Sequence, residues 1–375
     1  MVDIDLDLLK ETFKTLANIY SPSRNEKEVC DYVVSYLENL GCSIYLDNSY
    51  DRYGGNCPTI FSVLKGNKEG GVTLSAHIDV VEPNKGLKII DEGDIIKTDG
   101  TTTLGGDDKA GVAVILYALK YLVDNNIDHE DIYCIITPGE EAGMLGARNI
   151  NWDEVYQHIN PAKNTIVLDN AGKSEFIAHQ APSCNKFEIT VHGKKAHAGI
   201  EPEKGISAIK VISEIIEKLE FLRIDDLTTA NISYLHSDFP TNVVSDLATC
   251  KGEVRSHSYE KIEEIIDGYK SICIDVCSKY NCEYDFVSKQ EYPLLRSLDD
   301  LKFAKEFQKY YKKIGVDSKL QVIGGGSDAN FYAAQEFNAI IIGVGMQQVH
   351  TTDEYLEVNE MKKAASVLLE YLMRD

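Results

Sequence analysis

Residues 109–126 read KAGVAVILYALKYLVDNN, a run so apolar that a helix formed by it has to be buried. Short apolar segments bounded by turn residues flank this run on both sides and have the length of buried strands. These segments are residues 56–66, 71–81, 131–138 and 164–171. Strands that alternate with such a helix indicate an α/β layer structure, in which helices cover a mixed sheet.

The pattern of hydrophobic and polar residues changes after residue 178. Strands and helices are then expected in the order βαββαβ, which is typical of a ferredoxin-like α+β domain. The segments are residues 185–193, 205–222, 228–237, 247–258, 260–280 and 282–289. From about residue 290 the α/β pattern resumes. We therefore predict one α/β domain, formed by residues 1–179 and 290–375, that is interrupted by an inserted domain over residues 180–289.

Composition excludes several classes of partner and compartment. The formal charge of −22 argues against binding to nucleic acid or to an anionic membrane. Nine cysteines, an odd number without a CxxC pair, fit reduced thiols better than a disulfide framework. The acidic, amphipathic N-terminal segment lacks the features of a signal peptide, and no apolar run has the length of a membrane span. We expect a cytoplasmic protein.

A histidine and an aspartate lie at the end of one predicted strand. His77 and Asp79 are two residues apart in SAHIDVV, so their side chains point to the same face. Imidazole is the commonest metal ligand in proteins, and a nearby carboxylate can fix its tautomer through the other ring nitrogen. The alternative is a strand end that carries an incidental histidine.

Two adjacent aspartates precede the buried helix. Asp107 and Asp108 follow a Gly-Gly pair and open the apolar run. They could simply cap the helix N-terminus. They could also form a ligand platform, because open α/β sheets bind ligands at the carboxyl edge of their strands.

Further polar side chains follow other predicted strands. Glu140 and Glu141 come after the strand at 131–136, Asp169 after the strand at 165–168, and His350 after the strand at 339–344. If these strands are parallel, all of these side chains gather at one edge of the sheet. Imidazole and carboxylate ligands without thiolates suit zinc, cobalt or manganese. The alternative of solvated loop charges explains each acid alone but not their common placement.

Seven motifs occur in the order found in the superfamily of di-zinc metallopeptidases and aminoacylases, and the chain most closely resembles peptidase T and its tripeptidase-like relatives. The motifs are SAHIDVV (75–81), LGGDDKAG (104–111), TPGEEAGMLGA (137–147), LDNAG (168–172), KKAHAGIEPEKGISAI (194–209), GGGSDANF (324–331) and VHTTDEY (349–355). This resemblance implies a zinc-peptidase-like α/β domain with an inserted lid, and a metal-dependent aminopeptidase or tripeptidase that acts on small peptides.

The resemblance also implies a site for two divalent metal ions, zinc in the first place and cobalt or manganese as alternatives. The implied metal ligands are His77, Asp107, Glu141, Asp169 and His350. Asp107 would bridge the two ions, with a cis peptide after it, and Asp79 would orient His77. Glu140 would be the general base, which must stay off the metals because it needs free lone pairs to take a proton from the attacking water.

The inserted domain would supply substrate contacts. His197 is implied to donate to the tetrahedral oxyanion, often from a partner subunit, and a homodimer through the lid is therefore possible. Asn242 and Arg255 resemble the residues that hold the substrate carboxylate, for which a guanidinium is well shaped. The glycine amides around Gly325, together with Ser327, would face the substrate, and Asp328 would be structural.

Other functions remain open at this point. An N-acyl-amino-acid amidohydrolase or a carboxypeptidase would use the same metals with different pocket walls. A non-catalytic metal- or peptide-binding protein is disfavoured, because Glu140 stands beside a complete ligand set. The sequence VGMQQVH before His350 departs from peptidase T proper, which leaves strict tripeptide preference in doubt. His257 has no assigned role.

Overall fold

The computed structural model describes residues 2–374, which form two compact units. Unit 1 contains the residues up to Gln180, Leu295–Ile323, and the residues from Ser327 onward. Unit 2 contains Ala181–Leu294 and Gly324–Gly326. Each unit has its own hydrophobic core.

Unit 1 is built on an eight-stranded sheet of order β1-β2-β6-β3-β7-β15-β8-β14. The strands are β1 (Ser43–Asp47), β2 (Thr59–Leu64), β3 (Gly71–His77), β6 (Asp131–Thr137), β7 (Asn164–Asn170), β8 (Phe176–Gln180), β14 (Lys319–Val322) and β15 (Asn338–Gly343). The four central strands β6, β3, β7 and β15 are parallel, whereas β2 pairs antiparallel with β6. The prediction of a mixed sheet is therefore confirmed, and the carboxyl ends of its central strands share one edge.

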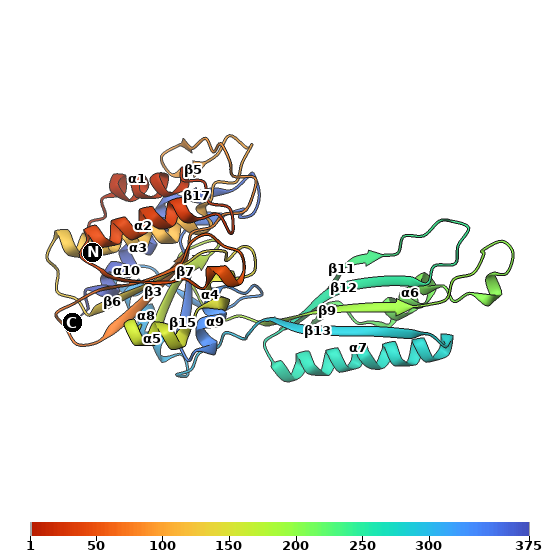
Figure 1. Ribbon diagram of the computed structural model, residues 1–375. Helices are drawn as coiled ribbons and strands as arrows, with labels where there is room; N and C mark the ends of the chain where they lie inside the picture. Colours follow the sequence, from red (N-terminus) through yellow and green to blue (C-terminus); the bar gives the residue numbers. More distant parts are fainter. Residues whose placement is uncertain (1, 375) are drawn as a thin grey trace. The chain divides into compact units, whose positions relative to one another are not determined.

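Helices cover both faces of this sheet (Figure 1). The helices of unit 1 are α1 (Leu6–Ala17), α2 (Lys27–Asn39), α3 (Gly106–Asp124), α4 (Leu145–Asn149), α5 (Trp152–His158), α8 (Lys302–Lys313), α9 (Asp328–Ala334) and α10 (Val358–Leu372), with the 3₁₀ turn η1 (Ser49–Arg52). The apolar α3 packs on β3 and β7 and contacts α1 and α10 on its other side. Nearly all of its side chains are buried, as the sequence predicts.

The opposite face of the sheet carries an aromatic cluster. Ile60 of β2 belongs to the core formed with α3, and the next residue, Phe61, therefore points to the other face. There Phe61 packs edge-on against Trp152 of α5, which also contacts Tyr332 of α9 and Phe337. Unit 1 is thus a three-layer α/β/α structure.

A second, small sheet lies beside the main one, with the order β16-β17-β5-β4. Its strands are β4 (Ile90–Asp91), β5 (Ile95–Lys97), β16 (Met346–Gln347) and β17 (Tyr355–Glu357). The sequence did not predict it, because strands of two or three residues carry no periodic pattern. It joins the segment before α3 to the segment that contains His350.

Unit 2 has the ferredoxin-like arrangement. Its sheet has the order β10-β11-β12-β9-β13, and every pairing is antiparallel. The elements are β9 (Ser183–His192), η2 (Pro202–Lys204), α6 (Ala208–Lys218), β10 (Leu222–Asp225), β11 (Thr228–His236), β12 (Leu247–Ser256), α7 (Tyr259–Tyr280) and β13 (Glu283–Tyr292). Apart from the short β10, they follow the predicted order βαββαβ. Helices α6 and α7 pack on the sheet and on each other.

The cysteines and the helices can be compared with the expectations of reduced thiols and of no membrane-spanning segment. All nine cysteines are free, and eight of them are buried. None of the helices within residues 2–374 combines the length and apolarity needed to cross a bilayer. A cytoplasmic location stays a prediction.

Candidate metal centre

The five predicted ligands lie close together, three at the carboxyl ends of central strands, Asp107 in the loop before α3 and His350 in the turn after β16. Nε2 of His77 lies 3.2 Å from Oδ1 of Asp107 and 3.7 Å from Oδ1 of Asp169. Nε2 of His350 lies 3.3 Å from Oδ2 of Asp107 and 2.9 Å from Oε1 of Glu141. Asp107 therefore stands between the two imidazoles.

Asp79 orients the first of these histidines. The Nδ1 atom of His77 lies 3.2 Å from both the carbonyl oxygen and Oδ1 of Asp79. Both side chains are buried. If Nδ1 carries the ring proton and donates it to Asp79, Nε2 keeps a lone pair directed at the remaining acids. This is the tautomer that a metal ligand requires.

The same carboxylate fixes the turn after β6. The backbone N–H of Glu140 donates to Oδ1 of Asp79 at 2.9 Å, and the backbone N–H of Glu141 donates to Oδ2 at 3.1 Å. Ser23 Oγ donates to Oδ2 at 2.6 Å. Asp79 thus fixes the backbone of both adjacent glutamates. Glu141 reaches His350, whereas none of the contacts described above involves the carboxylate of Glu140.

The adjacent aspartates before α3 have different surroundings. Asp107 faces the imidazoles, and the peptide bond between Asp107 and Asp108 is cis, as the resemblance implied. Asp108 is buried and accepts from the N–H of Gly111 at 3.1 Å and from the N–H of His77 at 3.3 Å. The simple helix-capping interpretation thus applies to Asp108, and regular helix begins after it.

The pKa values of the side chains in this site are shifted because many charged groups lie close together and are buried. Burial first, and the charge of Asp169 next, raise the pKa of Glu140 well above its usual range. Burial likewise raises the pKa of Asp169. Contacts with Asp107 and Glu141 raise the pKa of His350 to about 10. A divalent cation would reverse these tendencies, because positive charge favours ionised carboxylates and neutral imidazoles.

The donor atoms fit a pair of metal ions. Two groups have nitrogen and oxygen atoms within 4.8 Å of one another, namely His77, Asp107 and Glu141, and His77, Asp108 and Asp169. Oε1 of Glu141 is buried and accepts no hydrogen bond of good geometry from any described residue, although His350 lies beside it. An oxygen in this condition is what a cation satisfies. The neutral nitrogen and carboxylate ligands, without a thiolate, match zinc, cobalt or manganese.

Buried charged residues beneath these ligands were not predicted. The carboxylate of Glu354 is 2% exposed and accepts from three backbone N–H groups in the loop before α3. Lys109 is fully buried and donates to the carbonyl oxygen of Ile19 at 2.5 Å. Burial lowers the pKa of Lys109 to about 7 and raises the pKa of Glu354 to about 7. The available sequence signal was a lysine at the start of an apolar helix, but the residues around it in the structure are distant in sequence.

Glu26 and Asp328 complete this inner set. Glu26 is fully buried and accepts from the N–H of Arg24 at 2.7 Å. Burial, and then the charge of Asp79, raise the pKa of Glu26 to about 7. Asp328 accepts from the hydroxyl of Thr137 at the end of β6. This contact agrees with the structural role expected for Asp328.

Unit 2 places two of the predicted substrate residues side by side. His197 and Val243 form an isolated antiparallel bridge, and the N–H of Ala198 donates to the carbonyl oxygen of Asn242 at 2.9 Å. The N–H of Gly199 donates to Nδ1 of His197 at 3.1 Å. Nδ1 therefore accepts, and the ring proton of a neutral His197 sits on the exposed Nε2.

Arg255 lies elsewhere in unit 2. Its Nε donates to Glu253 at 2.7 Å, its Nη1 lies 3.4 Å from the carbonyl oxygen of Gly324, and its guanidinium is 6.0 Å from the ring centre of Tyr292. Gly326 packs so closely on Tyr292 that a Cβ there would lie 2.6 Å from the ring. Gly325 is exposed.

Ser327, in unit 1, is buried. Its hydroxyl accepts from the N–H of Ala329 as the N-cap of α9, and its N–H donates to Asn330 in a capping box. The substrate role of Ser327 stays a prediction, since its hydroxyl already serves the helix.

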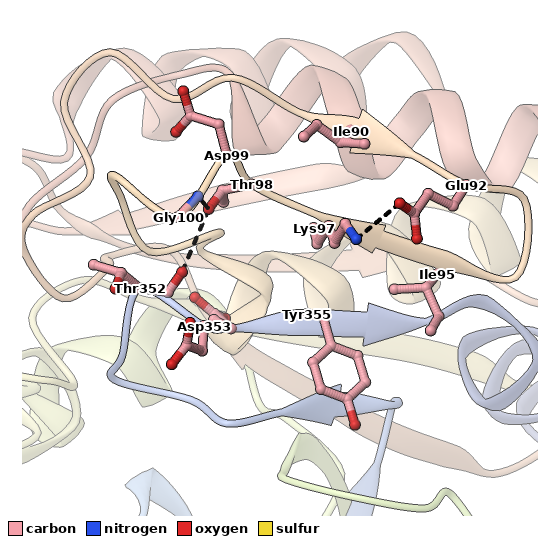
Figure 2. Close-up of a pocket in the computed structure, with 11 residues that line it drawn as sticks. Ile90, Glu92, Ile95, Lys97, Thr98, Asp99, Gly100, Thr352, Asp353 and Tyr355 are labelled. Atoms are coloured by element: carbon pink, nitrogen blue, oxygen red, sulfur yellow. Dashed lines mark hydrogen bonds and ion pairs between the residues drawn. The ribbon is translucent and has the colours of Figure 1, made fainter.

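A separate cavity of about 540 Å³ lies along the small sheet of unit 1 (Figure 2). Its wall is formed by Ile90, Glu92, Ile95, Lys97, Thr98, Asp99, Gly100, Thr352, Asp353, Glu354 and Tyr355. It contains none of the predicted metal ligands. Glu354 alone belongs both to this wall and to the support of Asp107.

Comparison with known proteins defines the class. Residues 73–374 match the Peptidase family M20/M25/M40. The protein YqjE of Bacillus subtilis is 35% identical over 362 residues, which cover 96% of each chain. Peptidase T of Clostridium botulinum is 26% identical over 359 residues, or 90% of this chain and 84% of that protein.

Solved structures agree. The aminopeptidase PepT from Bacillus cereus is 32% identical, with a TM-score of 0.92 over 99% of this chain and 98% of that one. A tripeptidase from Staphylococcus aureus is 28% identical, with a TM-score of 0.94 over the same shares. The chain belongs to the M20 family of metallopeptidases. The resemblance to peptidase T and tripeptidases, stated from the motifs, is confirmed.

Proposed function

We propose that this protein is a two-metal aminopeptidase that removes residues from the free amino end of short peptides, tripeptides among them. Zinc is the favoured ion. The observation that carries the proposal concerns the two adjacent glutamates after β6. Glu141 belongs to one of the two groups of potential metal ligands, whereas Glu140 belongs to neither of these groups. The aminopeptidase and tripeptidase names of the two similar structures support the choice of substrate.

His77, Asp107, Glu141, Asp169 and His350 would hold the two ions. Bound there, the ions would polarise the scissile carbonyl and lower the pKa of the attacking water. Glu140 would accept the proton of that water and return it to the leaving amine. Asp79 would keep His77 in the ligating tautomer and the Glu140–Glu141 turn in place.

Unit 2 would contribute to substrate recognition. We propose that His197 donates from Nε2 to the oxyanion, in line with a ring whose Nδ1 already accepts a hydrogen bond. Asn242 and Arg255 would bind the peptide carboxylate. A homodimer formed through unit 2 is part of the proposal, with the outer edges of β10 and β13 as the available strands.

The test compares two adjacent variants. Glu140→Gln is expected to keep both metal ions and to lose about 10²–10⁴-fold in turnover of a tripeptide. Glu141→Gln, its matched control, should instead lose metal. Retention of more than about a tenth of wild-type turnover by Glu140→Gln would show that another group is the base.

The choice of substrate needs a separate panel of tripeptides, dipeptides, amino-blocked tripeptides and N-acyl amino acids. An aminopeptidase should cleave the free tripeptides and reject the amino-blocked ones. Preference for N-acyl amino acids would instead identify an amidohydrolase, the second candidate left open by the sequence.

A further inference from the structure

Glu354 is not one of the implied ligands, yet it is the carboxylate that holds the Asp107 loop. Its Oε2 accepts from the N–H of Leu104 at 2.7 Å and from the N–H of Gly105 at 2.9 Å, and its Oε1 accepts from the N–H of Asp107 at 3.0 Å. These donors precede the regular turns of α3, so no helix carbonyl can satisfy them. Glu354 takes the place of those missing acceptors.

Glu354 also belongs to the turn that carries His350. This turn follows β16 and is closed by the N–H of Glu354 donating to the carbonyl oxygen of Thr351 at 3.2 Å. The hydroxyl of Thr351 donates to the carbonyl oxygen of Gln348 at 2.7 Å. His350 itself has a positive φ of 65°, a conformation that few side chains adopt without support from the surroundings. One residue thus joins the backbone of the His350 turn to the backbone of the Asp107 loop.

The remaining ligands are held by other elements. His77 is the last residue of β3, and Asp169 lies within β7, so the main sheet fixes both. Asp79, not Glu354, holds the backbone of Glu141. Among the three residues Asp107, Glu141 and His350, therefore, two depend on the connection that Glu354 makes.

We propose that Glu354 is a positioning residue for one half of the metal centre, the half formed by Asp107, Glu141 and His350. The inference rests on the two-metal site of the proposed function and adds that its two ions are supported by separate parts of the fold. Because Asp107 is the implied bridge, loosening its loop should affect both ions, but the ion of this half also depends on the His350 turn and should weaken more than the ion held by His77 and Asp169.

The test is stepwise binding of Zn²⁺ to chelator-stripped protein. Calorimetry measures the affinity of each step, and elemental analysis after dialysis measures the number of ions retained. In Glu354→Gln, one carboxylate oxygen becomes an amide NH₂, which faces at least one backbone N–H. We expect the ion of the His350 half to bind about 10- to 100-fold more weakly, the range typical of groups that orient metal ligands, and the other ion to weaken clearly less. Asp353→Asn is the matched control, because Asp353 is an exposed acid of the same turn and the same cavity wall (Figure 2). It should bind both ions as the wild type does.

Two further measurements separate positioning from a general loss of structure. Excess Zn²⁺ should restore the turnover of Glu354→Gln, which it could not do for a misfolded chain. Glu354→Asp keeps the charge on a shorter side chain and should fall between the wild type and Glu354→Gln in affinity for the second ion.

The possible outcomes separate this inference from the function on which it rests. If Glu354→Gln binds both ions within about threefold of the wild type, or if both ions weaken equally, the assignment of Glu354 to one half is wrong. If the wild type itself never binds more than one ion, the two-metal proposal and this inference fall together. If the wild type binds two ions but cleaves no peptide, only the proposed substrate is wrong.

Discussion

Replacement of Asp79 by asparagine tests the geometry of the metal centre most directly. The carboxylate of Asp79 receives the backbone N–H groups of Glu140 and Glu141 and faces Nδ1 of His77. An asparagine amide has only one acceptor oxygen. If that oxygen stays with Glu141, its NH₂ group faces the N–H of Glu140 and the imidazole. At least one buried donor then lacks an acceptor.

The expected magnitude follows from that count. A buried donor without a partner costs about 1–3 kcal/mol, and each 1.4 kcal/mol corresponds to a factor of ten, so Zn²⁺ affinity should fall roughly 5- to 150-fold. Turnover at limiting metal should fall with it. The assay is competition for Zn²⁺ against a chromophoric chelator at neutral pH.

Ser23→Ala provides the control for Asp79→Asn. It removes one donor to Asp79 but leaves the carboxylate and both backbone contacts in place. Because Ser23 is only half-buried, water can replace its hydroxyl, and affinity should change less than about fivefold. Zn²⁺ affinity of Asp79→Asn within threefold of the wild type would refute the proposed double role of Asp79.

Three further predictions concern metal, substrate and pH. Removal of the ions with a chelator should lower the free energy of unfolding by about 2.7 kcal/mol per ion present at 100 times its Kd, and an unchanged thermal midpoint would contradict a folded-state metal site. His197→Ala should lose about 10²–10³-fold in kcat with metal content intact, and metal loss instead would point to a ligand role. Asp91→Asn should destabilise the protein at neutral pH by about 1 kcal/mol, allowing for the partial exposure of the pair. Burial opposes the shift, but Lys10 and Lys14 lower the pKa of Asp91 to about 2 from its ordinary 3.8. The contribution of the ionised form is therefore complete above about pH 4 and disappears as the pH falls through about 2, so urea titrations of the two proteins should converge in acid and diverge at pH 7.

The close grouping of the candidate ligands could be predicted because most of them follow buried strands. Each apolar run ends where a ligand begins, as at His77 and Asp169, and parallel pairing then brings the ends together. Backbone alternation also predicted that Glu140 and Glu141 would point in different directions. For the pair before α3, the sequence left helix capping and ligand binding as alternatives. In the structure Asp108 caps the helix, and the ligand role of Asp107 stays a prediction.

The supporting contacts could not be predicted, because they join segments that are remote in sequence. Glu354 meets the backbone of Leu104 across 250 positions, and no local pattern marks an acceptor for another segment's amides. The small sheet that brings these segments together consists of strands too short for any periodicity. The hydrogen bond from the N–H of Gly199 to His197 is local in sequence, but it depends on the conformation of the loop rather than on its composition.

The two hydrogen bonds that Asp79 accepts from consecutive backbone amides limit how the sequence can change in evolution. Its two oxygens meet two successive peptide units, so the length of the turn between β6 and Glu141 is fixed even where its composition is free. A one-residue insertion or deletion there would present the wrong amides and would exchange the directions of the two glutamates. Ala142, which is exposed, can vary at little cost. Length change at residues 138–141 should therefore be far rarer among functional descendants than substitution at Ala142.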